Sequence, residues 1–456
     1  MITTVNPFTG EVLNQFQTNT HSEVESIIYS TNADFLDWKK SDIEKRLLFL
    51  ELLKIKITEL RESLCHLMAI EMGKPIRDGK AEVKKCISLC DYYHENLADF
   101  CKQEKIKTQW DESYTINEPL GVILGIMPWN YPLWQVMRIA IPTLMARNTV
   151  VLKHASSVTQ TAIEIEKLFQ LEGFSQNLFN VLILKGNAIQ EVINNPLIKG
   201  VSFTGSTKVG KKIGSLAGES LKKAVLELGG SDAYIITETA DLKNAAEKCL
   251  ESRLLNNGQS CISAKRLIIH NKVYESFKKY LQQAVKSYQL GDPLDENTDL
   301  GPMASSYLRD ELDDIVKTSI VEGAKVVYQG SIPKEGGTFY PITILENISK
   351  KMPLYHEEVF GPVLSLYSYE NINDAIEEIN NSDYGLGAGI FTENIEDFRS
   401  IVEHDIDVGT CCLNDYVKSN PKLPFGGIKN SGFGRELAKA GFTEFTNLKT
   451  ICVNKD

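Results

Sequence analysis

From about residue 120 onward, short runs of apolar and β-branched residues alternate with segments of helical length. This alternation limits the possible folds more than any other feature, because it is typical of βαβ units that build a parallel sheet covered on both faces. A first series of runs covers 121–126, 149–153, 178–184, 200–204, 224–228 and 233–236. A second series covers 266–270, 325–328, 341–345, 363–367 and 388–391. The sequence therefore predicts an α/β protein with two sheets, whose boundary is expected near Gly229-Gly230.

The two ends of the chain do not follow this pattern. The first hundred residues predict helices, one of them capped by Ser41 and Glu44 and another over about 80–101. Residues 104–119 and 443–454 predict strands outside both main sheets. Because such edge strands often pair across a subunit interface, we expect an oligomerisation arm and a homodimer or homotetramer.

The charge balance and the lack of long apolar runs argue against two classes of partner. With 49 basic and 60 acidic residues the net charge is −11, whereas nucleic-acid binding needs clustered Lys and Arg. The most apolar stretch, 133–152, is interrupted by Arg138, Pro142 and Arg147, so no membrane span is expected. Nine cysteines without an apolar leader predict reduced thiols and a cytoplasmic protein.

Residues 203–213 predict a strand, a tight turn and a helix N-terminus. Their spacing resembles a Walker A loop, but Lys212 stands where that motif needs Ser or Thr for magnesium, so a nucleotide-hydrolysing P-loop is rejected. The free amides of a helix N-terminus can still bind a phosphate. The sequence contains no G-x-G-x-x-G loop, and a plain strand–turn–helix connection stays open as the alternative.

Cys261 is the best candidate for a nucleophile among the nine cysteines. It follows the polar turn 256–260, where a thiol is reachable, whereas the other eight fit structural positions better. A structural role for Cys261 stays the alternative. Glu227, at the end of a predicted strand, is a candidate base, and Asn130, in a stiff turn between two prolines, is a candidate donor to an oxyanion.

The seven histidines show no metal-binding spacing, and no metal is expected. A thiol hydrolase would need His270 or His356 beside Cys261 in the fold, and this alternative stays open from the sequence.

Together these motifs resemble the NAD(P)-dependent aldehyde dehydrogenase superfamily, and most of all its bacterial succinate-semialdehyde dehydrogenases. The segments that match, in the family's order and spacing, are 128–130, 203–206, 227–230, 258–261, 357–362, 384–386 and 424–436. The resemblance implies an aldehyde-dehydrogenase-like α/β fold with a Rossmann-type NAD(P)-binding domain, an α/β catalytic domain and a β oligomerisation arm. The implied ranges are 1–103 and 120–228 for the first, 229–428 for the second, and 104–119 and 440–456 for the arm.

The resemblance also implies a mechanism and its residues. Cys261 matches the family's nucleophile, which attacks the aldehyde to form a thiohemiacetal and then a thioester, while Asn130 and the Cys261 amide would stabilise the oxyanion. Glu227 matches the general base that activates water to release the acid. The residues implied for the cofactor are Met127, Trp129, Lys153, Ser156, Thr204, Gly205, Ser206, Glu358 and Phe360.

A few positions bear on the choice of cofactor and substrate. Many NAD-preferring members carry Glu where this chain has Ser156, so repulsion of a 2′-phosphate is absent and NAD or NADP is expected. Arg138 and Ser419 match residues that bind the carboxylate of succinate semialdehyde, whereas the second arginine of that subfamily is replaced by Leu255. A helix-surface position is the plain alternative for Arg138. Succinate semialdehyde is the favoured small aldehyde substrate, and a broad aliphatic or aromatic specificity is the alternative.

Overall fold

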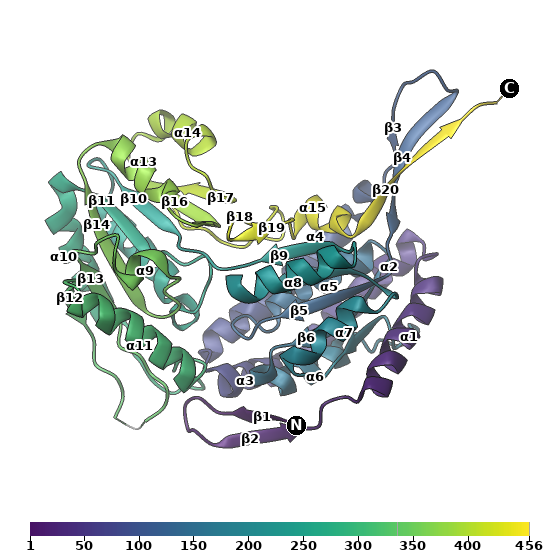
Figure 1. Cartoon of the computed structure of the whole chain (residues 1–456), viewed down its shortest axis with the longest axis horizontal. Coiled ribbons are helices and arrows are strands. Elements are labelled where there is room, and N and C mark those ends of the chain that lie inside the picture. The colour runs from purple at the N-terminus through teal and green to yellow at the C-terminus, as the bar shows by residue number, and fades with distance from the viewer. Residues whose placement is uncertain (335, 456) are drawn as a thin grey trace.

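The computed structural model describes residues 1–334 and 336–455 as two α/β lobes with a narrow projecting arm (Figure 1). The first lobe contains a six-stranded sheet of order β19-β9-β8-β5-β6-β7. Its strands are β5 (Val122–Met127), β6 (Thr149–His154), β7 (Phe179–Val181), β8 (Ile198–Thr204), β9 (Lys223–Glu227) and β19 (Gly432–Phe433). The strands β5 to β9 pair in parallel, as the alternating pattern predicts, and β19 joins the edge in the antiparallel direction.

Helices cover both faces of this sheet. Alternate side chains of β5 point to opposite faces, so that Ile123 packs with α5 and Leu124 with α7 and α8. The covering elements are α5 (Trp134–Met145), η1 (Ser156–Val158), α6 (Thr159–Leu168), η2 (Gly186–Ala188), α7 (Ile189–Asn194) and α8 (Thr207–Glu219). Every residue of α5 is buried, and the turn that carries Asn130 joins β5 to this helix.

The first hundred residues form a hairpin and four helices. The hairpin of β1 (Ile2–Val5) and β2 (Val12–Phe16) was missed by sequence reasoning. The helices are α1 (His21–Trp38), α2 (Ile43–Glu59), α3 (Arg61–Met72) and α4 (Ile76–Phe100), of which α4 is the helix predicted over 80–101. The predicted cap at Ser41 is wrong. Asp42 caps α2, because its carboxylate is the group that reaches the amide of Lys45, at 2.8 Å.

The second lobe contains a seven-stranded sheet of order β12-β13-β14-β11-β10-β16-β17. Its strands are β10 (Ala233–Ile236), β11 (Arg266–His270), β12 (Lys325–Gln329), β13 (Thr343–Glu346), β14 (Val363–Tyr369), β16 (Gly387–Phe391) and β17 (Thr410–Leu413). Only the β12–β13 pair is antiparallel. One face packs on α9 and α10, and the other on α13 and α14. The helices are α9 (Leu242–Leu254), η3 (Leu255–Gly258), η4 (Asn271–Val273), α10 (Tyr274–Ala284), η5 (Val285–Ser287), α11 (Ser306–Val321), α12 (Pro353–His356), α13 (Ile372–Asn380) and α14 (Ile395–His404).

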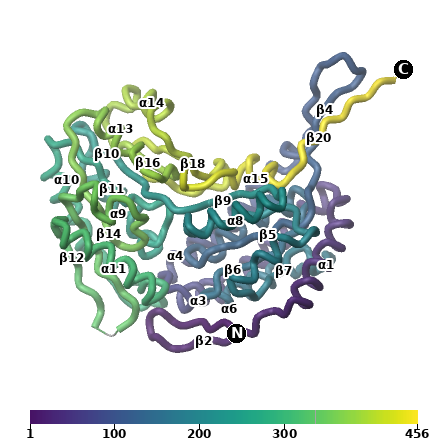
Figure 2. The backbone as a smooth tube through the Cα atoms, in the orientation of Figure 1, coloured from purple at the N-terminus to yellow at the C-terminus, as the bar shows by residue number. Residues whose placement is uncertain are grey.

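The arm is an antiparallel sheet of β3 (Glu104–Lys105), β4 (Glu112–Pro119) and β20 (Thr446–Val453), which lies outside both lobes as predicted. Figure 2 shows β4 and β20 projecting side by side, with the C-terminus at the tip. The helix α15 (Ala438–Glu444) occupies the first part of the segment 440–456, and residue 456 lies outside the described residues. Two short strands, β15 (Tyr384–Gly385) and β18 (Ile428–Lys429), form a separate pair.

None of the helices in the described part of the chain has the length and apolarity that a bilayer crossing needs.

Candidate active site

The turn that precedes Cys261 has a left-handed backbone. Asn256 and Asn257 have φ of 56° and 60°, and Gly258 has φ of 73°. Asn tolerates this conformation better than most residues. Glycine is needed at 258 because a Cβ there would lie 2.5 Å from the carbonyl carbon of Gly361. The polar, glycine-containing turn noticed in the sequence therefore bends the chain sharply after α9 and presents Cys261.

Arg253, fully buried at the end of α9, fastens this turn to the second lobe. Its guanidinium donates to the carbonyl oxygens of Val359 and Val363 at 2.7 Å each, to that of Gly258 at 3.1 Å, and to the hydroxyl of Ser263. Burial lowers the pKa of Arg253 to about 9, and the carbonyl dipoles compensate part of that cost. Because Gly258 and Ser263 flank Cys261 in sequence, Arg253 fixes the loop on both sides of the sulfur.

Asn130 lies against the same loop, as its predicted role requires. Its Nδ2 donates to the carbonyl oxygen of Gln259 at 3.0 Å, and the side-chain Nδ2 of Asn256 donates to the backbone carbonyl oxygen of Asn130 at 2.8 Å. Asn130 is buried, and its amide group carries two N–H bonds, of which the contact with Gln259 uses one. The structure thus brings Asn130 and the loop of Cys261 together from opposite lobes.

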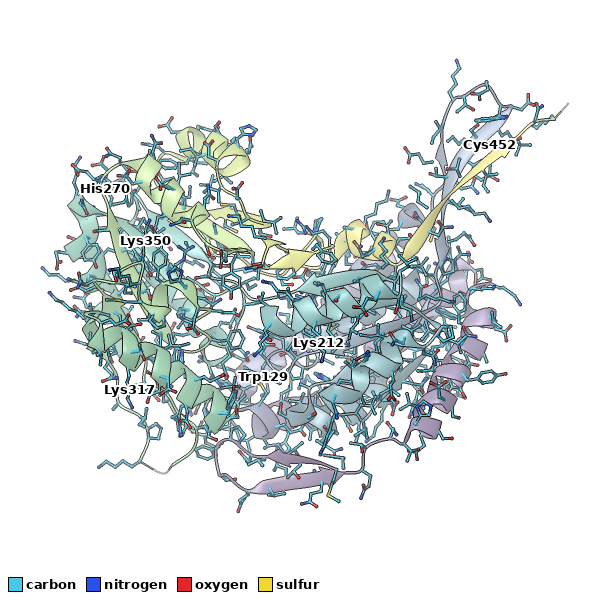
Figure 3. All side chains as sticks on the ribbon, in the orientation of Figure 1. Trp129, Lys212, His270, Lys317, Lys350 and Cys452 are labelled. Atoms are coloured by element: carbon cyan, nitrogen blue, oxygen red, sulfur yellow. The ribbon has the colours of Figure 1, made fainter. Side chains whose placement is uncertain are left out.

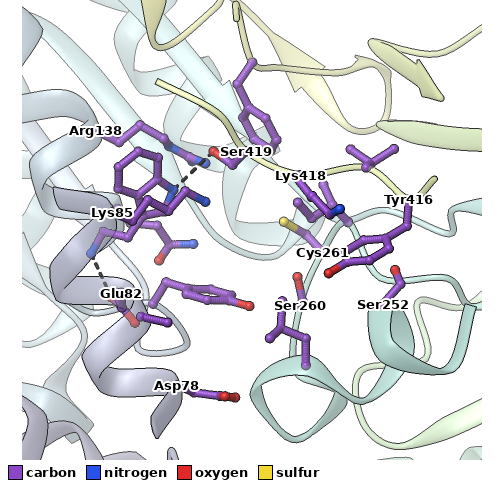
Figure 4. Close-up of a pocket in the computed structure, with 18 residues that line it drawn as sticks. Asp78, Glu82, Lys85, Arg138, Ser252, Ser260, Cys261, Tyr416, Lys418 and Ser419 are labelled. Atoms are coloured by element: carbon purple, nitrogen blue, oxygen red, sulfur yellow. Dashed lines mark hydrogen bonds between the residues drawn. The ribbon is translucent and has the colours of Figure 1, made fainter. Parts of the chain in front are cut away.

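Cys261 lines a cavity of about 160 Å³ between the lobes (Figure 4). One wall comes from α4 and α5, with Ser419 beside them, and the other comes from segments 252–262 and 416–418. Burial raises the pKa of the thiol to about 12, and the Lys265 ammonium opposes this shift. The sulfur is therefore protonated at neutral pH in the ligand-free protein, and nucleophilic attack requires the removal of that proton.

The two histidines that a thiol hydrolase would need lie elsewhere. The His270 ring packs edge-on against Tyr369 with ring centres 5.1 Å apart, and Figure 3 shows His270 at the outer side of the second lobe. His356 Nε2 contacts the carbonyl oxygen of Lys350. Neither histidine lines the Cys261 cavity, so the structure does not support the Cys–His alternative.

Glu227 ends β9 and is tied to the turn before α8, because its carbonyl oxygen accepts from the amide of Gly205 at 3.0 Å. Its carboxyl group is buried and lines neither the Cys261 cavity nor the cavity beside α8. Oε1 has no hydrogen-bond partner among the described residues, and a Cβ at Gly426 would lie 2.7 Å from it. Burial, and then the charge of Glu436, raise the pKa of Glu227 well above its usual value.

A second cavity, of about 210 Å³, lies beside the N-terminus of α8. It is lined by five residues implied for the cofactor: Met127, Lys153, Thr204, Gly205 and Ser206. Ser206 caps α8, while the buried Thr204 hydroxyl has no hydrogen-bond partner among the described residues. Burial lowers the pKa of Lys153. Half-buried Ser156 begins η1 beside this cavity, directly after the lining residue Ala155. The orphaned hydroxyl, the free helix amides and the ammonium fit the phosphates and ribose hydroxyls of a dinucleotide.

The other residues implied for the cofactor lie in a separate hollow. Glu358 and Phe360 line a depression beside α11, and the rings of Trp129 and Phe360 meet edge-to-face with centres 5.8 Å apart. Glu358 accepts from the amide of Gly230 at 3.0 Å and lies 3.6 Å from Lys265 Nζ. Figure 3 places Trp129 near the junction of the lobes. The implied cofactor residues are thus divided between two hollows.

Arg138 and Ser419, the residues implied for the substrate carboxylate, both line the Cys261 cavity. Arg138 is 3% exposed, so its helix-surface alternative is wrong, because α5 is buried all round. The guanidinium forms an ion pair with Glu436 and lies 4.6 Å from the centre of the Phe425 ring. Ser419 Oγ accepts from Trp134 Nε1 at 3.2 Å. The structure brings these two residues together on the side of the cavity opposite Cys261 (Figure 4).

The sequence and the fold of this chain were compared with those of known proteins. The aldehyde dehydrogenase family matches residues 1–451. The chain belongs to the aldehyde dehydrogenase family. The succinate-semialdehyde dehydrogenase (NADP(+)) of Deinococcus radiodurans is 38% identical over 448 residues, which cover 98% of this chain and 94% of that protein. Succinate-semialdehyde dehydrogenase (NADP(+)) 1 of Mycobacterium ulcerans is 39% identical over 457 residues, 99% of each chain. The crystal structure of succinic semialdehyde dehydrogenase from Streptococcus pyogenes in complex with NADP+ aligns with a TM-score of 0.96, 35% identity and full coverage of both chains.

Sequence reasoning missed the part of this aldehyde dehydrogenase site that α4 supplies. Asp78, Glu82 and Lys85 all line the Cys261 cavity. They stand at positions i, i+4 and i+7, and therefore on one face of the helix. A polar stripe among the buried apolar residues of α4 was the signal that could have found them.

Glu82 positions the first turn of α5 in this aldehyde dehydrogenase. Its Oε1 accepts from the backbone amides of Leu133 and Trp134 at 2.9 and 2.7 Å, and its other oxygen pairs with Lys74. These amides belong to the unpaired donors that every helix start presents. Because the turn carrying Asn130 leads directly into α5, the contact also restrains the position of Asn130.

Proposed function

We propose that this aldehyde dehydrogenase oxidises succinate semialdehyde to succinate with NADP+. The observation that carries the proposal is the Cys261 cavity, in which the nucleophile of the family faces a wall that bears cationic side chains. A carboxylate at the far end of a four-carbon aldehyde would meet Arg138 and Ser419 there. The names of the relatives from D. radiodurans, M. ulcerans and S. pyogenes support the same substrate and cofactor.

Acylation begins when deprotonated Cys261 attacks the aldehyde carbon to form a thiohemiacetal. Negative charge then develops on the former carbonyl oxygen, and the free N–H of the Asn130 amide and the backbone amide of Cys261 stabilise it. When bound, the nicotinamide accepts a hydride, which leaves a thioester on Cys261. Arg253 and Glu82 contribute by holding the loop and the turn that carry these groups.

Deacylation requires an activated water, and Glu227 is the proposed base. Its raised pKa makes it a strong base once it is ionised. Its carboxyl group interacts with the charges of Glu436 and Arg138 and does not line the Cys261 cavity in this structure, so the proposed role requires the side chain to move toward the thioester. Among the described residues no hydrogen bond to Oε1 opposes such a movement.

The proposed cofactor preference rests on the cavity beside α8. The described residues that line it include Lys153 and no acidic side chain. A carboxylate would repel the 2′-phosphate of NADP, whereas Ser156 offers a hydroxyl donor. We assign to the lobes the functions that the resemblance implies: residues 1–103 and 120–228 bind the cofactor, and residues 229–428 supply the nucleophile.

Steady-state kinetics with a panel of aldehydes and both cofactors test the proposal. We expect kcat/KM for succinate semialdehyde to exceed that for butanal by about 10-fold or more, as a charge-assisted contact would give. Cys261→Ala should abolish the formation of reduced cofactor. Equal efficiency with both aldehydes would instead favour the broad aliphatic or aromatic alternative. If no aldehyde yields reduced cofactor while iodoacetamide still alkylates Cys261, the dehydrogenase mechanism is wrong.

A further inference from the structure

Lys85 places an ammonium group in the Cys261 cavity. It lies on the face of α4 that lines this cavity, and its Nζ is 4.3 Å from the centre of the Trp134 ring. The side chain is half-buried, whereas its neighbour Lys84 is exposed to solvent. Figure 4 shows Lys85 on the same side of the cavity as Arg138 and Ser419, across from Cys261.

The other cations that line the cavity already have carboxylate partners. Arg138 pairs with Glu436, and Lys418 pairs with Asp415 at 2.7 Å. Lys85, by contrast, has no carboxylate oxygen within 4.0 Å anywhere in the described ranges 1–334 and 336–455. Among the cations that line this cavity in the described part of the chain, Lys85 is therefore the one without an ion-pair partner.

The acidic groups of the cavity are also occupied. Glu82 pairs with Lys74 and accepts from two backbone amides at the start of α5. Asp78 accepts from the amide of Asn256 at 3.1 Å and lies 3.8 Å from Arg77 Nε. A desolvated ammonium without a counter-ion is costly, and the Trp134 ring offsets only part of that cost. An anionic ligand group would supply the missing partner.

We propose that Lys85 binds the carboxylate of the semialdehyde substrate from the α4 wall of the cavity, while Leu255 on the other wall stands where the subfamily has its second arginine. This inference rests on the proposed function. Arg138 is already paired with Glu436, which weakens its attraction for the substrate carboxylate. The positive charge of Lys85 adds to that attraction. The contact selects for aldehydes with a terminal carboxylate and leaves the reaction at Cys261 unchanged.

The charges around Lys85 make its contribution dependent on pH. Burial, and then Arg138 on the facing helix α5, lower the pKa of Lys85 to about 8, with a smaller effect from Lys74. Cys86 and Glu82, on its own helix, act in the opposite direction. Because the ammonium is lost as the pH rises through 8, substrate affinity should fall between pH 7 and 9. Arginine at this position would stay charged throughout that range.

The experiment compares Lys85→Met, Lys85→Arg and the control Lys84→Met in the whole enzyme with saturating NADP+. For Lys85→Met we expect KM for succinate semialdehyde to rise about 10-fold or more, with kcat/KM for butanal within about 2-fold of wild type. Lys85→Arg should keep a low KM and lose the rise of KM between pH 7 and 9. Lys84→Met should behave as wild type.

Binding of the product gives an independent readout. Succinate should raise the Tm of the wild-type protein and of Lys85→Arg, and should raise that of Lys85→Met much less. If Lys85→Met does not fold, Lys85→Gln replaces it in both measurements. A wild-type enzyme that prefers succinate semialdehyde, combined with equal changes for both aldehydes in Lys85→Met, would overturn this inference alone. A wild-type enzyme without that preference would overturn the proposed function and this inference together.

Discussion

At the scale of single residues, burial disfavours the ionised forms of both Cys261 and Glu227. Burial raises the pKa of the thiol to about 12 and that of the carboxyl group well above its usual range. Burial therefore favours the neutral form of both groups in the ligand-free protein, and the protonated thiol is protected from oxidation and side reactions. The ionised forms that the proposed mechanism needs are stabilised by nearby cations, such as Lys265 for Cys261 and Arg138 for Glu227.

Replacing Glu227 separates the two halves of the proposed reaction. Glu227→Gln should still form the thioester, because Asn130 and Cys261 are untouched, but it should hydrolyse that thioester slowly. We expect a burst of about one reduced cofactor per active site, followed by turnover slowed about 100-fold or more. Rapid-mixing absorbance at the nicotinamide band measures both phases. Glu219→Gln removes an exposed carboxylate of the same lobe and serves as the control; unimpaired turnover in Glu227→Gln would contradict the role of Glu227.

The residues of the site were predictable from the sequence to different degrees. Cys261 and Asn130 follow from local motifs, because a short turn determines which way each side chain is presented. The direction of the Glu227 carboxyl group does not, since it depends on Glu436 and Arg138, which lie far away in sequence. Lys85 was missed because the polar stripe of α4 does not show what this face packs against; its contact with Trp134 comes from α5, which lies far away in sequence.

At the scale of elements, the apolar pattern of the sequence predicted those strands whose burial is set by their own residues. Runs of apolar β-branched residues became the parallel strands β5 to β9, because both faces of such strands are buried. The antiparallel edge strand β19 could not be predicted, since it comes from the distant C-terminal part of the chain and two residues carry no period. The N-terminal hairpin of β1 and β2 was missed because its residues are mostly exposed and show no apolar alternation.

The turn η3 gives a prediction at this scale. Gly258→Ala adds a Cβ that would lie 2.5 Å from the backbone carbon of Gly361, and backbone atoms cannot move aside as a flexible side chain can. We expect a loss of about 3 kcal/mol in the free energy of unfolding and a large fall in the alkylation rate of Cys261. The midpoint of urea unfolding and the iodoacetamide reaction measure these effects.

Gly10→Ala is the matched control for that substitution. Gly10 has φ of 77°, close to the 73° of Gly258, but a Cβ there would have no atom within 4 Å. Gly10→Ala therefore introduces the same backbone strain but no steric clash. We expect it to lower the free energy of unfolding by about 1 kcal/mol. Equal losses in the two variants would show that the close approach to Gly361 does not matter.

At the scale of the whole molecule, the acidic protein binds its proposed anionic ligands with local devices. The net charge of −11 says nothing about the clefts, where the amides of α8, Lys153, Arg138 and Lys85 gather positive charge. The segment that links β5 to α5 lines both cavities, with Pro128 in one and Tyr131 in the other, so the first lobe contributes to both. The division of the chain into two sheets is visible in the alternating pattern of the sequence, whereas the cavities depend on how the lobes pack.

The arm leads to the last prediction, at the scale of the assembly. Its side chains Ile106, Trp110 and Leu448 are 44%, 42% and 65% exposed, although apolar side chains of this size are usually covered. We propose that a second copy of the chain covers them, as the position of the strands outside both lobes predicted. Trp110→Glu with Leu448→Glu should therefore shift the protein to a smaller species in analytical ultracentrifugation, because burying two carboxylates in an apolar interface is costly. The control Val321→Glu changes an 88% exposed residue at the end of α11 in the second lobe, and it should leave the mass of the assembly unchanged. An unchanged mass in the double variant, or a monomeric wild type, would show that the arm has no such role.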